Sequence, residues 1–286
     1  MNTSQNKYIA AAAFAISKAD AVLVTAGAGM GVDSGLPDFR GDEGFWKAYP
    51  PFKEAGLNFM SLANPQLFDN DPHLAWGFYG HRLSLYSGTK PHRGYGVLRR
   101  IIEGAPLGGR VLTSNVDGAF FKAGFSAGQV AEVHGSLSHL QCTSHCGIGL
   151  VSSNGVKVDI DPHTFRAVGN LPRCPGCGSV LRPNVLMFND GGWDSSRTQQ
   201  QELGVECWLR GIAGRNLVVI EVGAGTGIPT IRLMSERTAI RHNGIHIRIN
   251  LRESEGDRGT LSIPMGASAA LEAIEEELVD QRFQAA

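Results

Sequence analysis

The segment AVLVTAGAGMGVDSGLPDFRG, residues 21–41, joins a strand-like run to a glycine-rich turn. Its first residues are apolar and β-branched, which is typical of a parallel strand buried on both faces. Gly27, Ala28 and Gly29 then let the backbone turn sharply and approach a pyrophosphate. A dinucleotide-binding fingerprint G-x-G-x-x-G would place its last glycine at Val32, so the match is incomplete. The segment continues instead into Pro37, Asp38, Phe39 and Arg40.

The charge of the chain is nearly balanced. The 286 residues include 26 Lys and Arg against 27 Asp and Glu, a net charge of -1, which gives no electrostatic case for nucleic acid or an anionic membrane. No apolar run approaches the roughly 20 residues that span a bilayer. The first 20 residues are amphipathic and lead straight into a strand, which predicts a helix rather than a signal peptide. We therefore expect a cytoplasmic protein without nucleic-acid or membrane partners.

Strand-like and helix-like segments alternate along the chain, which predicts an α/β fold with a doubly wound parallel, Rossmann-like sheet. The expected strands are Ala21–Thr25, Arg110–Thr113, Gln129–Val133, Leu217–Val222 and Ile245–Ile249. The expected helices are Pro72–Tyr86, His92–Glu103, Asp117–Ala123, Ser196–Arg210, Pro229–Thr238 and Ala267–Arg282. Ligands bind such sheets beyond the carboxyl ends of the strands. Small, polar or glycine-rich residues follow all five expected strands, which indicates one shared crevice.

Two regions interrupt this alternation. Residues 41–64 are aromatic and punctuated by Gly and Pro, which predicts a flexible cover over the site, followed by a helical insert at about 65–90. Residues 138–182 have little periodicity and contain two cysteine pairs. We expect this stretch to form a small inserted module. The sheet domain would then comprise residues 1–137 and 183–286.

The paired cysteines predict a structural metal site. Four thiolates satisfy tetrahedral zinc with no open position, and the chain shows no export signal that would favour disulfides. The second pair has the specific C-P-x-C-G form, whereas the first pair is looser and 27 residues separate the two. His139 and His145 are nearby alternative ligands, and Cys207 is expected to be a small core residue on a helix. The proposed zinc ligands are Cys142, Cys146, Cys174 and Cys177.

His134, Asn115 and Asp117 follow neighbouring strands. A histidine at a strand's carboxyl end can act as a general base near neutral pH, although a lone histidine is more often structural. Asn115 and Asp117 are placed to orient a ribose and a water, but Asp117 is equally well placed to cap the next helix. A second glycine loop at Gly223, Ala224 and Gly225 is a weak signal by itself.

Together these motifs resemble the sirtuins, the NAD-dependent protein deacylases, over most of the chain. GAGMGVDSGLPDFRG (residues 27–41) is similar to the family's long NAD-binding signature, and TSNVDG (113–118) to its Thr-Gln-Asn-Ile-Asp-Gly. EVHGS (132–136) resembles the catalytic-histidine strand, the cysteine pairs resemble the zinc module, and INL (249–251) resembles the adenosine-ribose asparagine. All five occur in the family's order.

The resemblance implies two bound groups, NAD and one structural zinc ion, and an acylated lysine of a protein as partner. It implies that Asp38 and Arg40 anchor the glycine loop while Phe39 shields the reactive ribose face. His134 would deprotonate a ribose hydroxyl, and Asn115 and Asp117 would hold the ribose, the nicotinamide amide and water. The implied NAD-binding residues are Gly27, Ala28, Gly29, Asp33, Pro37, Asp38, Phe39, Arg40, Trp46, Ser114, Asn115, Asp117, His134, Gly223, Ala224, Gly225, Asn250, Leu251 and Ala267.

The chain departs from the family pattern mainly where the substrate peptide would bind. In the expected peptide segment, Asn189 replaces a glycine and Asp190 replaces a glutamate, and on the NAD side Ser114 replaces a glutamine. Asn189 could reshape the peptide groove, so the substrate is the least constrained feature. The implied peptide-binding residues are Val185, Leu186, Phe188 and Asn189.

Tyr79 and Arg82 lie three residues apart on one face of an expected helix. The pair is similar to the Tyr-x-x-Arg of the sirtuin subgroup that removes succinyl and malonyl groups. A guanidinium grips a carboxylate bidentately, and the phenol adds a donor. The competing interpretation is a solvated arginine above a packed tyrosine.

Three functions remain open at this point. The first is a zinc-stabilised NAD-dependent protein-lysine deacylase, with succinyl or malonyl as the candidate preferred acyl groups. The second is an ADP-ribosyltransferase or NAD hydrolase of the same fold, which the altered residues Asn189 and Asp190 suggest. The third is a non-catalytic NAD-binding module, against which His134 and Asn115 argue.

Overall fold

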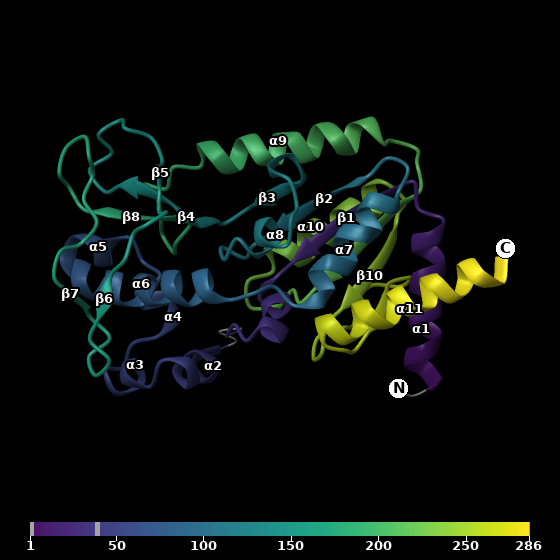
Figure 1. Ribbon diagram of the computed structural model, residues 1–286, viewed down its shortest axis with the longest axis horizontal. Helices are drawn as coiled ribbons and strands as arrows, with labels where there is room; N and C mark the ends of the chain where they lie inside the picture. Colours follow the sequence, from purple (N-terminus) through teal and green to yellow (C-terminus); the bar gives the residue numbers. More distant parts are fainter. Residues whose placement is uncertain (1–2, 38–40, 286) are drawn as a thin grey trace.

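A six-stranded parallel sheet with strand order β11-β10-β9-β1-β2-β3 organises the larger lobe of the molecule (Figure 1). The computed structural model describes residues 3–37 and 41–285. The strands are β1 (Ala21–Ala26), β2 (Gly109–Thr113), β3 (Val130–Glu132), β9 (Leu217–Val222), β10 (Ile245–Ile249) and β11 (Leu261–Ile263). The five expected strands are confirmed to within two residues, and β11 is an additional three-residue edge strand.

Helices cover both faces of this sheet. Val22 and Val24 of β1 pack into one apolar core, and Ala21 and Leu23 pack into another on the opposite face. Successive strand residues point to opposite sides, so every residue of β1 is buried, as the apolar run predicts. One face is covered by α1 (Thr3–Ser17), α7 (Arg93–Gly104) and α11 (Ala267–Ala285), and the other by α9 (Ser196–Gly211) and α10 (Thr230–Arg241). The doubly wound α/β fold is confirmed.

The smaller lobe joins the cysteine-containing segment to a helical region (Figure 1). Its antiparallel sheet has the order β5-β4-β8, and a separate hairpin pairs β6 with β7. The strands are β4 (Gly135–Cys142), β5 (Val151–Ser152), β6 (Asp159–Ile160), β7 (Ala167–Val168) and β8 (Leu181–Val185). The helix α6 (Pro72–Gly88) forms the centre of this lobe and packs on the β6–β7 hairpin.

The segment 41–64, which is expected to be a flexible cover over the site, contains three short helices. They are α2 (Gly41–Ala48), α3 (Pro50–Glu54) and α4 (Phe59–Leu62), and α5 (Gln66–Asn70) follows. Phe45, Tyr49 and Phe52 are each at most 1% exposed and pack against Phe78 of α6. The aromatic residues that suggested a cover therefore form a second apolar core. Within the described residues, no helix is long and apolar enough to cross a membrane.

Candidate active site

The carboxyl ends of the central strands bring most of the expected site residues to one edge of the sheet. Ala26 pairs with both Thr113 and Val222, Thr113 pairs with Glu132, and Val222 pairs with Ile249. Because all five strands are parallel, the residues that follow them lie at the same edge. Those residues are the loop at Gly27, Ser114 and Asn115, His134, the loop at Gly223, and Asn250.

The two glycine loops touch each other through backbone atoms. A Cβ at Gly27 would lie 2.7 Å from the Ala224 Cα, and one at Gly223, where φ is +65°, would lie 2.3 Å from the Met30 N. The Gly29 N–H also donates to the Gly223 carbonyl at 2.9 Å. Side chains at Gly27 and Gly223 would force the loops apart, which explains why glycine is required at both.

Asn115 fixes the first loop to the neighbouring strand. Its Nδ2 donates to the Gly27 carbonyl at 2.9 Å, and its backbone N–H donates to the Thr113 Oγ1 at 3.1 Å. The Ser114 N–H donates to the Ala26 carbonyl at 3.1 Å, so the strand ladder continues into this turn. Asn115 therefore ties the first glycine loop to the end of β2.

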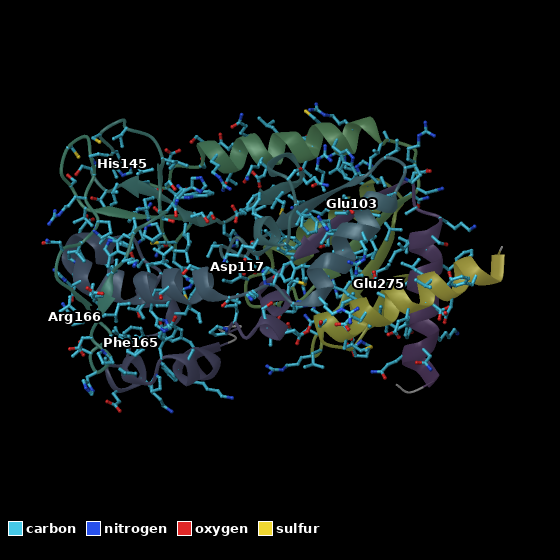
Figure 2. All side chains as sticks on the ribbon, in the orientation of Figure 1. Glu103, Asp117, His145, Phe165, Arg166 and Glu275 are labelled. Carbon is cyan, nitrogen blue, oxygen red and sulfur yellow. The ribbon has the colours of Figure 1, made fainter. Side chains whose placement is uncertain are left out.

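Asp117 lies at the junction between the two lobes (Figure 2). Its Oδ1 accepts a hydrogen bond from the Ala119 N–H at 2.8 Å, an Asx turn that leads into α8 (Ala119–Lys122). The N-cap of that helix is Gly118, so the expected helix cap at Asp117 is wrong. Burial raises the pKa of its carboxyl, against opposing effects that include the nearby Arg82 and Lys122. The second carboxylate oxygen, Oδ2, takes no part in this turn and faces Gly31 of the glycine loop.

His134 lies between the strand edge and the expected peptide segment. Its carbonyl accepts a hydrogen bond from the Leu186 N–H at 3.0 Å, and the next residue, Gly135, pairs with Val185. Gly135 has a φ of +78°, and a Cβ there would lie 2.1 Å from the Asn184 carbonyl oxygen. Burial lowers the pKa of His134 below the ordinary 6.5, so its imidazole is neutral at pH 7 and can accept a proton.

Glu132, two residues before His134, is a buried acid next to the candidate base that the sequence did not single out. It is 1% exposed, and its Oε2 lies 2.6 Å from the Arg197 Nη2 of α9. Thr198 and Gln201 of α9 bond to the Glu132 carbonyl and N–H at 3.0 and 3.1 Å. Burial raises the pKa of Glu132 to about 7, against the opposing effect of Arg197. Helix α9 thus fixes β3, the strand that His134 follows.

Several other expected NAD-binding residues have structural partners. The Asp33 carboxylate accepts the Ser268 N–H at 2.7 Å, so it caps the start of α11 beside the buried Ala267. Asn250 donates to the Ala224 carbonyl at 2.7 Å and thereby supports the second glycine loop. The indole N–H of Trp46 donates to the Leu57 carbonyl at 2.6 Å.

Leu251, Pro37, Asp38, Phe39 and Arg40 are the remaining expected NAD contacts. Leu251, next to Asn250, is 65% exposed, and Pro37 is partly buried. Asp38, Phe39 and Arg40 lie outside the described residues, so their expected roles stay predictions.

A buried charge network behind Asn250 was not expected from the sequence. Arg248 and Glu221 lie opposite each other on β10 and β9, with Nε–Oε1 and Nη2–Oε2 distances of 2.7 and 3.0 Å. The Arg248 Nη1 also donates to the Glu255 carbonyl at 2.7 Å. The network therefore ties the loop after Asn250 to the sheet interior.

A second buried ion pair anchors the expected peptide segment after β8. Arg182 and Asp190 bond bidentately at 2.8 Å for both contacts, with side chains 3% and 0% exposed. Asn189 has a φ of +56°, the left-handed region that favours glycine and that asparagine tolerates better than most residues. The replacement of the expected glycine therefore leaves the turn intact. Leu186 is 38% exposed, and the Phe188 N–H donates to the Ala63 carbonyl at 2.9 Å.

Tyr79 and Arg82 are both buried on α6, so the solvated-arginine interpretation is wrong. The Arg82 Nε and Nη2 donate to the Tyr86 Oη at 3.0 and 2.9 Å, and the guanidinium lies 5.2 Å from the centroids of both Phe78 and Tyr86. The Tyr79 Oη is buried and has no hydrogen-bond partner among the described residues. Tyr86, one helical turn after Arg82, was missed, although its i+4 spacing is visible in the sequence.

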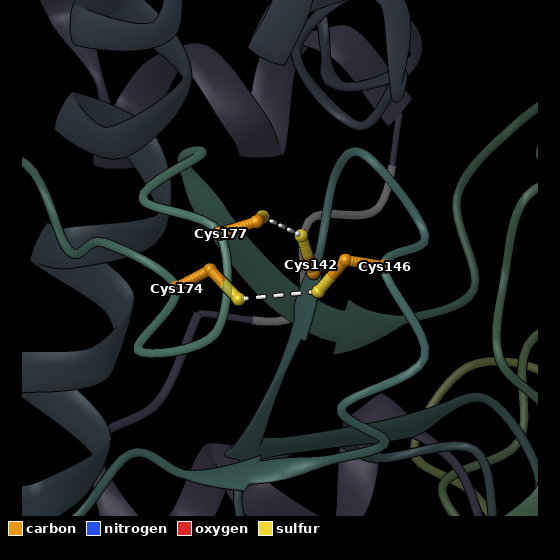
Figure 3. Close-up of side chains that lie close together, drawn as sticks. All are labelled: Cys142, Cys146, Cys174 and Cys177. Carbon is orange, nitrogen blue, oxygen red and sulfur yellow. Dashed lines mark hydrogen bonds between the residues drawn. The ribbon is translucent and has the colours of Figure 1, made fainter.

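The four expected cysteines form one cluster in the smaller lobe (Figure 3). Their Sγ atoms all lie within 4.8 Å of one another, and the pairs Cys142–Cys177 and Cys146–Cys174 are each 3.5 Å apart. Tetrahedral zinc with bonds of about 2.3 Å places sulfurs roughly 3.8 Å apart, so this group fits one zinc ion. In the described part of the chain, neither His139 nor His145 belongs to the group. Cys207 is exposed on the solvent side of α9, so its expected core position is wrong.

Comparison with known proteins places these features in a family. A family model described as the Sir2 family matches residues 27–207. The chain belongs to the Sir2 family. It is 32% identical to an NAD-dependent protein deacylase of Aeropyrum pernix, over 73% of this chain and 72% of the relative. It is 33% identical to the mitochondrial NAD-dependent protein deacylase sirtuin-5 of Canis lupus familiaris, over 61% of this chain and 57% of the relative.

The fold is also that of solved Sir2 proteins. A structure of a Sir2 homolog–NAD complex superposes with a TM-score of 0.66, at 22% identity, over 95% of this chain and 94% of the homolog. The residues of this Sir2 chain fit a dinucleotide at the carboxyl edge of the sheet. The outward-facing part of each loop, at Ala28, Gly29 and Gly225, carries no side chain larger than a methyl group, so a pyrophosphate can approach the backbone.

Proposed function

We propose that the chain is an NAD-dependent protein-lysine deacylase. The observation that carries this proposal is the position of His134, whose carbonyl is hydrogen-bonded to Leu186 of the expected peptide segment while the residue follows a strand of the NAD-binding edge. A base in this position is adjacent both to the cofactor edge and to the substrate strand. The names of the curated relatives support the same activity.

Each site residue has a role that follows from its contacts. Bound NAD would supply an electrophilic ribose carbon when nicotinamide leaves. Asn115 keeps the first glycine loop in shape, and the outer faces of both loops would receive the pyrophosphate. His134 would take a proton from a ribose hydroxyl onto an imidazole nitrogen, which its lowered pKa keeps neutral at pH 7. The Asp117 Oδ2 lies beside Gly31 and can orient a ribose or a water.

We also propose that the acyl pocket favours succinyl or malonyl groups. Arg82 is buried among aromatic rings on α6, and the Tyr79 Oη is a buried donor without a partner among the described residues. Such a pair matches a carboxylate that is removed from water, because the guanidinium supplies charge and the phenol a hydrogen bond. An unpaired buried hydroxyl costs about 1–3 kcal/mol, so a ligand that pairs it gains that amount.

The experiment that tests this function compares acetyl-lysine and succinyl-lysine peptides of one sequence, with formation of the acylated ADP-ribose as the readout. Deacylation of the succinyl peptide should exceed that of the acetyl peptide, and Arg82→Met should reverse the order. Equal rates with both peptides and both proteins would remove the acidic-acyl proposal but keep the deacylase.

The other functions predict different products. Free ADP-ribose or a labelled protein, formed without acyl peptide, would instead support NAD hydrolysis or ADP-ribosyl transfer. No release of nicotinamide under any condition would support a non-catalytic NAD-binding module. The cytoplasmic location and the absence of nucleic-acid and membrane partners stay predictions from the sequence.

A further inference from the structure

The long connection between the cysteine pairs leaves the metal cluster and reaches the helical region. Residues 147–173 separate Cys146 from Cys174, and they include the β6–β7 hairpin (Figure 1). Phe165 and Arg166, at the turn of this hairpin, lie beside the helices of the smaller lobe rather than beside the cysteines (Figure 2). The length of this connection exceeds what a zinc site needs, so the extra residues require another explanation.

The hairpin docks on one glycine face of α6. A Cβ at Gly77 would lie 1.9 Å from the Phe165 carbonyl oxygen, and one at Gly80 would lie 3.0 Å from the Val158 Cβ. Gly77 and Gly80 are three residues apart and therefore share a face of the helix. Tyr79 and Arg82 each follow one of these glycines by two residues, which places them about 200° around the helix. The hairpin thus presses on α6 from the side opposite the proposed acyl pocket.

Phe165 has an unusual backbone conformation that its packing maintains. Its φ is +52°, which is rare for a bulky side chain and costs about 1–3 kcal/mol. Its ring lies 5.6 Å from Tyr49, 5.5 Å from Phe52 and 5.4 Å from His81 by ring centroids. Tyr49 and Phe52 belong to the segment that follows the NAD-binding motif, and His81 belongs to α6. Phe165 therefore contacts both α6 and the segment that follows the NAD-binding motif.

Arg166 fixes the first turn of α6. Its guanidinium bonds bidentately to Asp71, at 2.8 and 2.6 Å, and Asp71 caps the helix by accepting the Leu74 N–H at 3.2 Å. The His73 Nδ1 lies 2.8 Å from the Ala167 carbonyl oxygen, which adds a second link between the hairpin and the same turn. The start, the middle and one face of α6 are all held by the hairpin.

We propose that the β6–β7 hairpin is a substrate-positioning element of the deacylase, with Phe165 and Arg166 as positioning residues. It holds α6, which carries Tyr79 and Arg82, in register with the segment that follows the NAD-binding motif. This inference rests on the deacylase function proposed above. Its consequence is that residues far from the reacting atoms determine how tightly the acyl-lysine peptide binds. A misplacement of about 1 Å in a helix that positions the substrate lowers catalytic efficiency by up to about 100-fold.

Steady-state kinetics with the acyl-lysine peptide that the wild type prefers tests this proposal. Phe165→Ala, Arg166→Met and Gly77→Ala should each raise the KM for that peptide about tenfold or more, while kcat at saturating peptide stays within about threefold. Gly77→Ala matters because it displaces the hairpin without altering it. Val168→Ala, on the same hairpin with Val168 52% exposed, is the matched control and should behave like the wild type.

The outcomes separate the proposal from the function on which it rests. An unchanged peptide KM in folded Arg166→Met and Gly77→Ala proteins would overturn the positioning role, even if Phe165→Ala failed to fold. A lower kcat together with a lower Tm, without a change in the KM for the peptide, would also overturn it. A purely structural role predicts that pattern. A wild type that releases nicotinamide without any peptide would overturn the deacylase function itself.

Discussion

Replacement of Tyr86 by Phe should weaken carboxylated substrates selectively. The Tyr86 Oη accepts two hydrogen bonds, at 3.0 and 2.9 Å, from one edge of the buried Arg82 guanidinium. Hydrogen bonds to charged groups contribute about 1.5–3 kcal/mol, and the phenylalanine ring would keep the cation–π contact while losing them. The acyl carboxylate would then have to order the guanidinium itself. We expect kcat/KM for a succinyl-lysine peptide to fall about 10- to 150-fold.

Parallel assays with succinyl-lysine and acetyl-lysine peptides of the same sequence measure this effect. The acetyl group has no carboxylate, so its kcat/KM should change less than about threefold in Tyr86→Phe. Tyr95→Phe is the matched control, because the Tyr95 Oη is buried without a partner among the described residues. An equal loss for both peptides would show that Tyr86 supports the fold only, and no loss for either would refute the role assigned to Arg82.

Three further predictions concern stability and pH. Asp190→Ala leaves the Arg182 guanidinium, which is 3% exposed, without its carboxylate. The free energy of unfolding should fall by about 3–5 kcal/mol, and calorimetry should show a Tm lower by about 5–8 °C. A shift under about 1 °C would contradict this prediction. Chelation of zinc, or Cys174→Ser, should lower Tm, and added zinc should restore only the chelated wild type; a Tm insensitive to both would argue against a structural metal. Burial lowers the pKa of His134, so its neutral form persists below pH 6.5. The acidic limb of the pH profile of peptide-dependent kcat/KM should therefore have its midpoint below pH 6.5. A midpoint above pH 7 would contradict the proposal that His134 is the base.

Most of the fold and the metal site could be predicted from short local sequence patterns. The apolar runs at β1 and β9 predicted buried parallel strands because a strand covered on both faces has no polar side. The cysteine cluster was predictable because the ligand spacing lies in the sequence itself. By contrast, β11 has only three residues and too little periodicity to be recognised.

Features that depend on tertiary packing could not be predicted. The Gly and Pro residues of segment 41–64 predicted a flexible cover, but the short helices there and the packing of their aromatic side chains against α6 gave no local signal. Glu132 gave no signal because its partner, Arg197, lies 65 residues away on α9. The left-handed conformation of Asn189 explains in structural terms why a glycine position tolerates this residue. The function of the hairpin at Phe165 likewise depends on contacts that no local pattern contains.

The most direct test of the deacylase function is nicotinamide release from NAD, measured for wild type and His134→Ala with an acetyl-lysine peptide, a succinyl-lysine peptide and no peptide. The proposed role of His134, as the base that acts after the acyl group has engaged the cofactor, predicts release that requires an acyl peptide, acylated ADP-ribose as the product, and loss of that product in His134→Ala. Equal release with and without peptide, or full product formation by His134→Ala, would contradict it.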